Sequence, residues 1–237
     1  MPTDHAGSFT DRPDDKTVGV LGGMGPLATA DFFHLLVRMT PADKDWNHLH
    51  IIVDDNPRIP SRSRAFLFDE ASPSPYLVTG AQRLVALGAQ LLVVPCNSAA
   101  YYLAPVRAAV TVPILDPVVA TAHYARATAK APLVLGGMVT HRAGLYAHEL
   151  GVETVRPSDT EQEEVAALIE VLKHGQVTNE VVARTRAVIE AGLGRGADSV
   201  ILGCTEFGLI APHLALAVPV FNSNELLARR TVELARA

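Results

Sequence analysis

Two short strings in the first half of the chain return at matching points in the second half. Residues 20–24 and 134–138 both read VLGGM, and residues 94–97 (VPCN) are echoed by residues 202–205 (LGCT). The first string opens each half, and the second lies at the end of a buried strand expected in each half. The repeat predicts two similar lobes that face one another.

Short apolar runs alternate with helical patterns through both halves, and this order is typical of βαβ units around a parallel sheet. In the first half, strands are expected at 17–21, 49–53 and 91–94, helices at 26–39, 75–87 and 99–109, and a long loop at 54–74. In the second half, strands are expected at 133–135, 152–155, 199–202 and 218–221, and helices at 141–150, 160–173, 178–193 and from 224 to the end.

These patterns predict an α/β fold of two similar lobes, each a mostly parallel sheet flanked by helices. We expect the lobes to be related by a pseudo-two-fold axis, with the active site between them, because ligand sites commonly lie between domains. The first lobe comprises residues 17–115 together with the closing helix at 224–237, and the second comprises residues 116–223. The polar, aspartate-rich residues 1–16 are expected to form a disordered tail.

The composition narrows the function classes. Of the 237 residues, 49% are hydrophobic and 19% charged, as is ordinary for a soluble α/β protein. The net charge of −5 and the lack of a Lys/Arg-rich block argue against a nucleic-acid partner. No apolar run approaches the ~18 residues of a membrane span. The opening residues show no secretory core, so we expect a cytoplasmic protein.

The only two cysteines, Cys96 and Cys204, each end an apolar run and precede small polar residues at which a helix can start. In open α/β sheets, ligands bind at the carboxyl ends of strands. A helix amino terminus also favours a thiolate. The matched context predicts one site with two proton-handling thiols.

Three other roles remain open for these cysteines. Free cysteine is often a packing residue in the core. An even cysteine count permits a disulfide, although a chain without a secretory segment is expected in a reducing compartment, which disfavours one. No Cys or His lies at CxxC spacing, and two distant thiols make half a zinc site, so no metal is expected.

Four motifs together carry a family resemblance: residues 22–26 (GGMGP), 56–60 (NPRIP), 95–98 (PCNS) and 203–206 (GCTE). With them the chain resembles the aspartate/glutamate racemase family, most closely its aspartate racemase branch. The similarity spans Val18 to the C-terminus. It implies an isomerase that needs no pyridoxal phosphate or other cofactor, takes a small amino acid as its substrate and forms a homodimer.

In that family, two cysteines flank the α-carbon of the substrate, and one removes the α-proton while the other supplies a proton to the opposite face. The resemblance assigns these roles to Cys96 and Cys204. It places Arg62 and Lys173 on the side-chain carboxylate of an acidic substrate. The remaining substrate-binding positions are Met24, Gly25 and Glu206, and four residues that would hold the α-carboxylate: Asn97, Ser98, Thr140 and Thr205.

Several positions depart from the family pattern. Ser98 replaces a usual threonine, Ala100 stands where histidine is common, and Gly137 and Val139 alter the second-lobe motif. The sequence therefore predicts racemisation of aspartate, glutamate or a similar amino acid. Hydantoin racemisation, maleate isomerisation, malonate decarboxylation, broad-specificity racemisation and non-catalytic binding of an amino acid or dicarboxylate remain alternatives.

Overall fold

The computed structural model describes residues 15–237, so residues 1–14 of the predicted tail lie outside the described part. The last two residues of that tail, Asp15 and Lys16, contact the end of the C-terminal helix α10 (Ser223–Ala235). The Lys16 amide donates to the Ala235 carbonyl at 2.8 Å, and Arg236 pairs with Asp15 at 3.3 Å. The start of the described chain is thereby fixed to its end.

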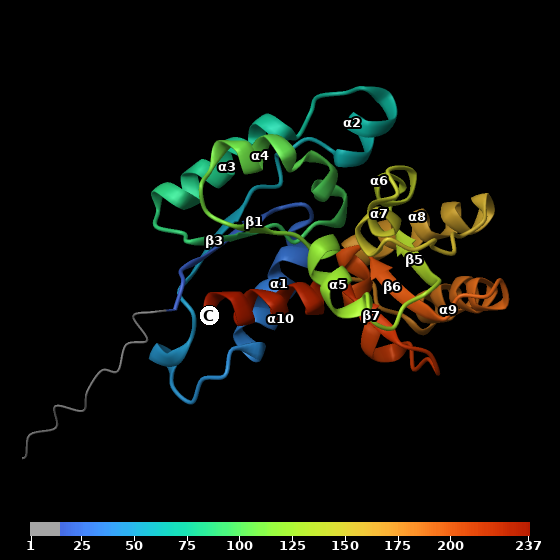
Figure 1. The fold of residues 1–237 in the computed structure, drawn as a ribbon. Coiled ribbons are helices and arrows are strands. Elements are labelled where there is room, and N and C mark those ends of the chain that lie inside the picture. The colour runs from blue at the N-terminus through green and yellow to red at the C-terminus, as the bar shows by residue number, and fades with distance from the viewer. Residues whose placement is uncertain (1–14) are drawn as a thin grey trace, which may run out of the picture.

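Two separate parallel sheets form the two lobes (Figure 1). The first has the order β2-β1-β3-β4 and the second the order β5-β6-β7, and every pair is parallel. The predicted α/β class is confirmed. The strand bounds are β1 Val18–Gly22, β2 Ile51–Asp55, β3 Leu91–Val93, β4 Ile114–Leu115, β5 Pro132–Gly136, β6 Ser199–Gly203 and β7 Val220–Asn222.

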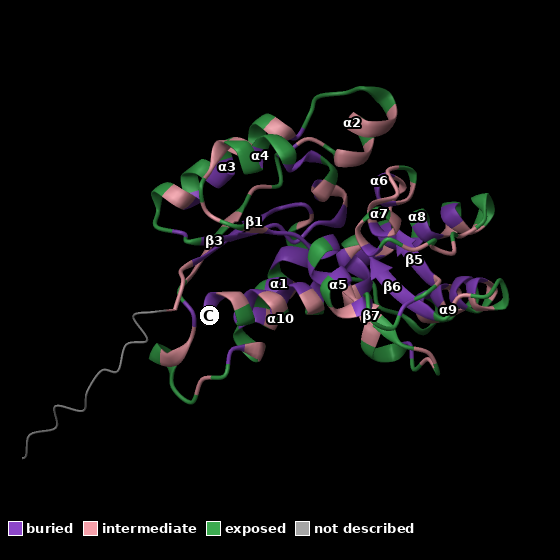
Figure 2. Ribbon diagram, in the orientation of Figure 1, coloured by how far each residue is buried: buried purple, intermediate pink, exposed green. Residues whose placement is uncertain are grey.

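Helices cover both faces of the sheets, which explains why the central strands are apolar at every position. All residues of β1, β5 and β6 are buried (Figure 2). In the first lobe, α3 (Ser74–Ala86) and α4 (Ala104–Ala109) pack on one face, and α1 (Pro26–Met39) and α10 pack on the other. In the second lobe, α8 (Asp159–Lys173) and α9 (Asn179–Gly194) pack opposite α5 (Pro117–Ala125) and α7 (Leu145–Leu150).

Capping residues explain where the long helices begin. Ser158 and Glu161 form a reciprocal capping box at the start of α8, and Thr178 accepts from the Val181 amide at the start of α9. Pro26 occupies the first turn of α1, where its missing N–H is not needed. None of the helices between residues 15 and 237 is long and apolar enough to cross a membrane.

Four expectations about local structure were wrong. Residues 99–109 form two helices, the 3₁₀ helix η2 (Asn97–Tyr102) and α4, because Pro105 starts a new helix. Residues 141–150 likewise contain α6 (Met138–Arg142) and α7, separated at Gly144 with φ +60°. The expected strand at 152–155 is reduced to one bridge between Leu133 and Val155. The loop at 54–74 contains α2 (Arg62–Phe68).

The sequence patterns also missed β4 and α5. The remaining 3₁₀ helices are η1 (Asp45–Asn47), η3 (Thr205–Leu209) and η4 (Ala211–His213).

Candidate active site

The two cysteines follow the central strands of their sheets. Cys96 comes shortly after β3 and precedes η2, and Cys204 comes directly after β6 and precedes η3. Both are free thiols, so the disulfide alternative does not hold for this structure. Cys96 is buried, and Cys204 is partly exposed.

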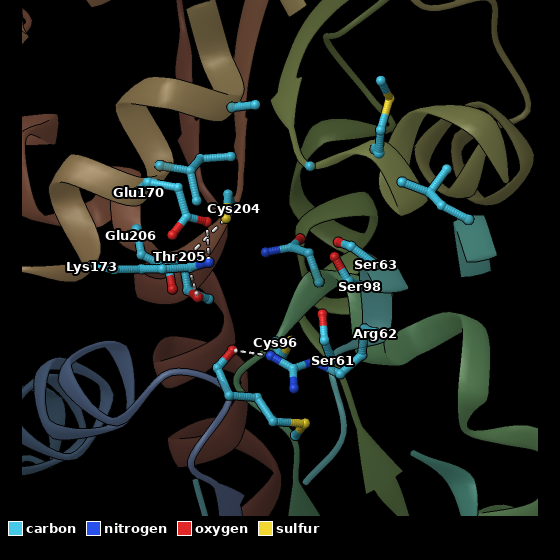
Figure 3. Close-up of a pocket in the computed structure, with 17 residues that line it drawn as sticks. Ser61, Arg62, Ser63, Cys96, Ser98, Glu170, Lys173, Cys204, Thr205 and Glu206 are labelled. Atoms are coloured by element: carbon cyan, nitrogen blue, oxygen red, sulfur yellow. Dashed lines mark hydrogen bonds and ion pairs between the residues drawn. The ribbon is translucent and has the colours of Figure 1, made fainter. Parts of the chain in front are cut away.

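A cavity of about 280 Å³ between the lobes contains both cysteines in its lining. Figure 3 shows Cys96, Ser98, Ser61, Ser63 and Arg62 on one side and Cys204, Thr205, Glu206, Glu170 and Lys173 on the other. This size suits a small polar ligand better than a large cofactor. The full lining is Met24, Ser61, Arg62, Ser63, Leu67, Cys96, Asn97, Ser98, Gly137, Met138, Ala166, Ile169, Glu170, Lys173, Cys204, Thr205 and Glu206.

Nine of the eleven predicted site residues therefore lie around one cavity. Gly25 is adjacent to it: a Cβ on Gly25 would lie 3.7 Å from Glu206 Oε1. Thr140 does not line it. Its hydroxyl is buried without a partner beside a smaller cavity, and its methyl lies 2.9 Å from where a Cβ on Gly136 would stand.

The turn after β1 brings Met24 to the cavity. This turn requires glycine at position 23, where φ is +87° and an added Cβ would lie 2.2 Å from the Asn56 backbone. Thr29 stabilises the turn, because its hydroxyl accepts from the Gly23 amide and donates to the Gly25 carbonyl, both at 2.9 Å.

The Cys204 thiol is held in its protonated form. Although the residue as a whole is partly exposed, desolvation of its sulfur raises the pKa of Cys204 well above the ordinary value, and the nearby Glu206 carboxylate raises it further. Sγ donates to Glu206 Oε2 at 2.9 Å, and the Thr205 hydroxyl donates to the same oxygen at 3.3 Å. Glu206 is itself 3% exposed, so solvent screens its charge only weakly.

The expectation that a helix amino terminus lowers the thiol pKa is therefore wrong for Cys204. The following helix, η3, is a short 3₁₀ segment of five residues, and its few aligned amides offer little compensation. Desolvation and the Glu206 charge outweigh it.

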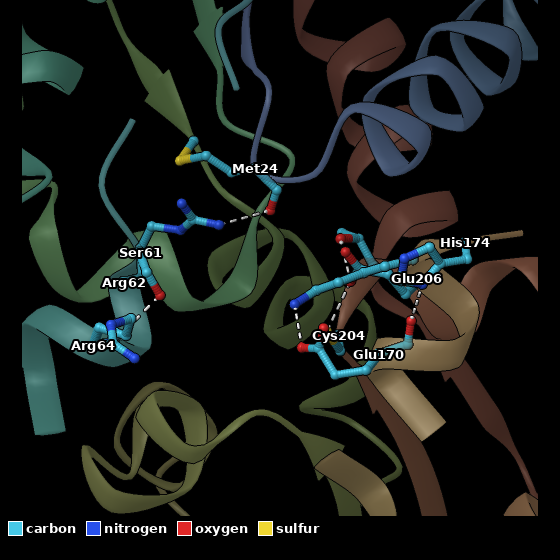
Figure 4. A network of polar contacts seen from close by, with 10 residues as sticks. Met24, Ser61, Arg62, Arg64, Glu170, His174, Cys204 and Glu206 are labelled. Carbon is cyan, nitrogen blue, oxygen red and sulfur yellow. Dashed lines mark hydrogen bonds and ion pairs between the residues drawn. The ribbon is translucent and has the colours of Figure 1, made fainter. Parts of the chain in front are cut away.

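Arg62 starts α2, whose amino end is capped by the Ser61 hydroxyl accepting from the Arg64 amide. Its guanidinium donates to backbone carbonyls, reaching Pro60 at 3.1 Å and Met24 at 3.3 Å (Figure 4). Its Nε is buried without a partner. Within residues 15–237, no carboxylate forms an ion pair with Arg62, so its charge is available to an anion in the cavity.

Lys173 approaches from the last turn of α8 and already has an anionic partner. Its Nζ contacts Glu170 Oε1 at 2.5 Å. Both side chains are substantially exposed, at 43% and 65%, so the pair is weak and can be exchanged for a ligand contact.

Eight lining residues were not among the predicted site residues, and one of them, Gly137, was noted only as a departure from the family pattern. One face of α8 carries Lys173 together with Ala166, Ile169 and Glu170. Positions three or four residues apart lie on the same face of a helix, so the spacing from Lys173 back to Ala166 could have identified these residues. Ser61, Ser63 and Leu67 were missed because the segment that forms α2 was expected to be a loop, although proline and serine before residue 62 are a helix-start signal. Met138 was overlooked at the start of α6.

Residues 21–231 match the family described as Asp/Glu/Hydantoin racemase. The chain belongs to this family. It is accordingly a racemase, an isomerase, and its resemblance to aspartate/glutamate racemases is confirmed.

Known relatives agree with this assignment. The broad-specificity amino-acid racemase RacX of Bacillus subtilis is 27% identical over 222 residues, which cover 91% of this chain and 96% of that protein. Picrophilus torridus aspartate racemase superposes with a TM-score of 0.80 at 29% identity, covering 93% of this chain and 94% of that one. An aspartate racemase homologue from Pyrococcus horikoshii gives 0.76 at 26% identity, covering 94% and 100%.

Proposed function

We propose that this family member racemises an acidic amino acid, with Cys96 and Cys204 as the two groups that exchange a proton with the α-carbon. The observation that carries the proposal is the arrangement of the thiols: one from each lobe lines the same small cavity. Inversion requires one group to remove a proton from one face and another to deliver a proton to the opposite face.

The environment of Cys204 suggests its role in the resting enzyme. As a thiol beside Glu206, it can donate its Sγ proton to the planar carbanion after the Cys96 thiolate removes the α-proton. In the reverse direction Cys204 must act as the base. Glu206 Oε2, which already accepts the Sγ hydrogen, can take that proton and leave a thiolate.

The charges around the cavity support a substrate with a side-chain carboxylate. Arg62 has no carboxylate partner among the described residues and presents a planar guanidinium that suits bidentate binding. Thr205 and Ser98 lie next to the two thiols and offer hydroxyl groups for the α-carboxylate. The proposal retains the expectation of a cytoplasmic homodimer that needs no cofactor.

A broader substrate range is the second candidate. The Glu170–Lys173 ion pair neutralises one of the two cations in the cavity, which weakens selection for a second carboxylate. The similarity to a broad-specificity racemase supports the same alternative.

Exchange of the α-proton in deuterated water tests the proposal. Purified protein is incubated without added cofactor with each L- and D-amino acid, and NMR follows loss of the α-proton signal while chiral chromatography follows inversion. We expect aspartate or glutamate to exchange and invert, and Cys96→Ser and Cys204→Ser each to abolish inversion. Full inversion by both single variants would refute the two-cysteine mechanism.

A further inference from the structure

A buried chain of hydrogen bonds joins the two lobes through residues close in sequence to the two cysteines. The Tyr146 hydroxyl donates to Asn97 Oδ1 at 2.6 Å, and Asn97 Nδ2 donates to Ser223 Oγ at 3.0 Å. Ser223 Oγ in turn donates to the Leu202 carbonyl at 2.6 Å. Tyr146, Asn97 and Ser223 are 1%, 3% and 0% exposed, so water does not compete for these bonds.

Two members of the hydrogen-bond chain are close to the cysteines in sequence. Asn97 follows Cys96, and Leu202 precedes Cys204 by two residues on β6. The ring of Tyr146 also packs against the backbone next to Cys204, since a Cβ on Gly203 would lie 3.0 Å from Tyr146 Cε2. Tyr146 thus contacts the neighbours of both thiols.

Each member comes from a different element. Asn97 belongs to η2 of the first lobe, Tyr146 to α7 and Leu202 to β6 of the second. Ser223 begins α10, which runs from the end of the second sheet to the first (Figure 1). The bonds run in one direction, because each side-chain group donates once to the next acceptor, and this fixes the orientation of the Asn97 amide.

We propose that Tyr146 and Ser223 are positioning residues that set the separation and relative orientation of the Cys96 and Cys204 thiols across the boundary between the lobes. The catalytic part of this inference rests on the proposed two-cysteine function. It also adds to the expected role of Asn97. Its carbonyl oxygen and one of its two amide hydrogens are engaged by protein groups, so it links the lobes in addition to the substrate-binding role expected for it.

The strength of the effect follows from the geometry of proton transfer. Two thiols must lie on opposite faces of one carbon at the same time, and a misplacement of about 1 Å can reduce a rate ~100-fold. Tyr146→Phe and Ser223→Ala each remove one oxygen and add no bulk. We expect each to lower kcat at least ~10-fold in both directions, with KM changed less than ~2-fold, because the substrate-binding groups stay in place.

The matched control is Thr231→Val. Thr231 is 0% exposed on the same helix as Ser223, and its hydroxyl donates to the Leu227 carbonyl at 2.7 Å within α10. This variant also removes one buried hydroxyl donor, but away from the cysteines. We expect its stability loss to match that of Ser223→Ala while its kcat stays at the wild-type value.

A measurement independent of activity reports on the thiols themselves. Full-length protein is treated with dibromobimane, a short reagent that bridges two nearby thiols, and mass spectrometry follows formation of the Cys96–Cys204 bridge. Single-thiol alkylation rates correct for accessibility. We expect the corrected bridging rate to change severalfold in Tyr146→Phe and Ser223→Ala and to stay unchanged in Thr231→Val.

The results separate this inference from the proposed function. An unchanged bridging rate and kcat in both variants overturns the positioning role, even if the cysteine variants are inactive. If the cysteine variants invert normally but bridging still changes, the two-cysteine mechanism fails and the control of thiol geometry stands. A kcat loss in Thr231→Val equal to that in Ser223→Ala attributes the effect to general destabilisation and also overturns the positioning role.

Discussion

Glu206 accepts the hydrogen of the Cys204 thiol at 2.9 Å from within the same turn of chain. A carboxylate at this distance disfavours the thiolate, whereas a neutral amide does not. The pair therefore fixes the resting proton on sulfur and provides a place to which that proton can move.

Replacing Glu206 by glutamine should lower the pKa of Cys204, because the negative charge that opposes ionisation is removed. In a Cys96→Ser background, where Cys204 is the only thiol, the midpoint of iodoacetamide labelling against pH should move to lower pH. Glu170→Gln serves as the control, since Glu170 lies in the same cavity but contacts Lys173. Equal midpoints with and without Glu206 would contradict this electrostatic coupling.

Removing the Arg62 guanidinium should weaken acidic substrates selectively. A hydrogen bond to a charged group contributes about 1.5–3 kcal/mol, so Arg62→Ala should raise KM for aspartate or glutamate ~10–100-fold. Arg62→Lys keeps the charge but loses the planar fork, and its effect should be intermediate. The measurement is KM for an acidic and for an uncharged amino acid under the same conditions. An equal rise in both KM values would show that Arg62 does not bind the side-chain carboxylate.

Removing the charge of Glu170 should favour acidic over uncharged amino acids, because Lys173 is then left without its partner. The pair is exposed and contributes at most ~1 kcal/mol, so the ratio of kcat/KM values should change no more than about fivefold. Glu149→Gln is a suitable control, since it removes the anion from another exposed ion pair, with Arg126 at 3.4 Å. If kcat/KM for acidic amino acids falls relative to that for uncharged ones in Glu170→Gln, Glu170 itself selects the acidic substrate.

The stability of the fold should decline as the pH falls below about 6.5, partly because of His141. Burial lowers the pKa of His141 to about 4, and the positive charge of Arg156 contributes. The folded state therefore keeps this histidine neutral while the unfolded state takes up a proton. Between pH 7 and pH 5, this linkage removes about 2 kcal/mol.

Urea unfolding of the wild type and of His141→Gln at both pH values isolates that contribution. The difference in unfolding free energy between the two proteins should change by about 2 kcal/mol from pH 7 to pH 5. If the unfolding free energies of the two proteins change equally between pH 7 and pH 5, His141 does not cause the pH dependence.

The central strands could be predicted because their burial on both faces leaves an unbroken apolar run, as in β1 and β6. The same unbroken runs explain why the two strand-end cysteines could be located from the sequence alone. The two-residue strand β4 gives too short a signal, and α5 begins with Pro117, which resembles a break although Asp116 caps the helix through the Val118 and Val119 amides.

The site was predicted well where the residues follow a strand and less well where they depend on packing between elements. Arg62 was identified by motif, but its helix was not, because α2 contains no buried residue. Thr140 lies in the expected sequence context but does not line the cavity. Its methyl packs against Gly136, and its hydroxyl lies beside a smaller cavity. Its position depends on packing against Gly136, a contact that a sequence motif does not report.

The contact between Lys16 and Ala235 has a consequence for engineering. Because the two ends of the described chain meet at a 2.8 Å hydrogen bond, a short linker could join them without disturbing either sheet. New termini could then open at Gly88, where φ is +99° and an added Cβ would meet nothing within 4 Å. Circular permutants of this kind would place Lys16 and Ala235 inside a continuous chain. Their new ends would lie before β3, at the opposite end of that strand from Cys96, so a fluorophore attached there would leave the cavity open.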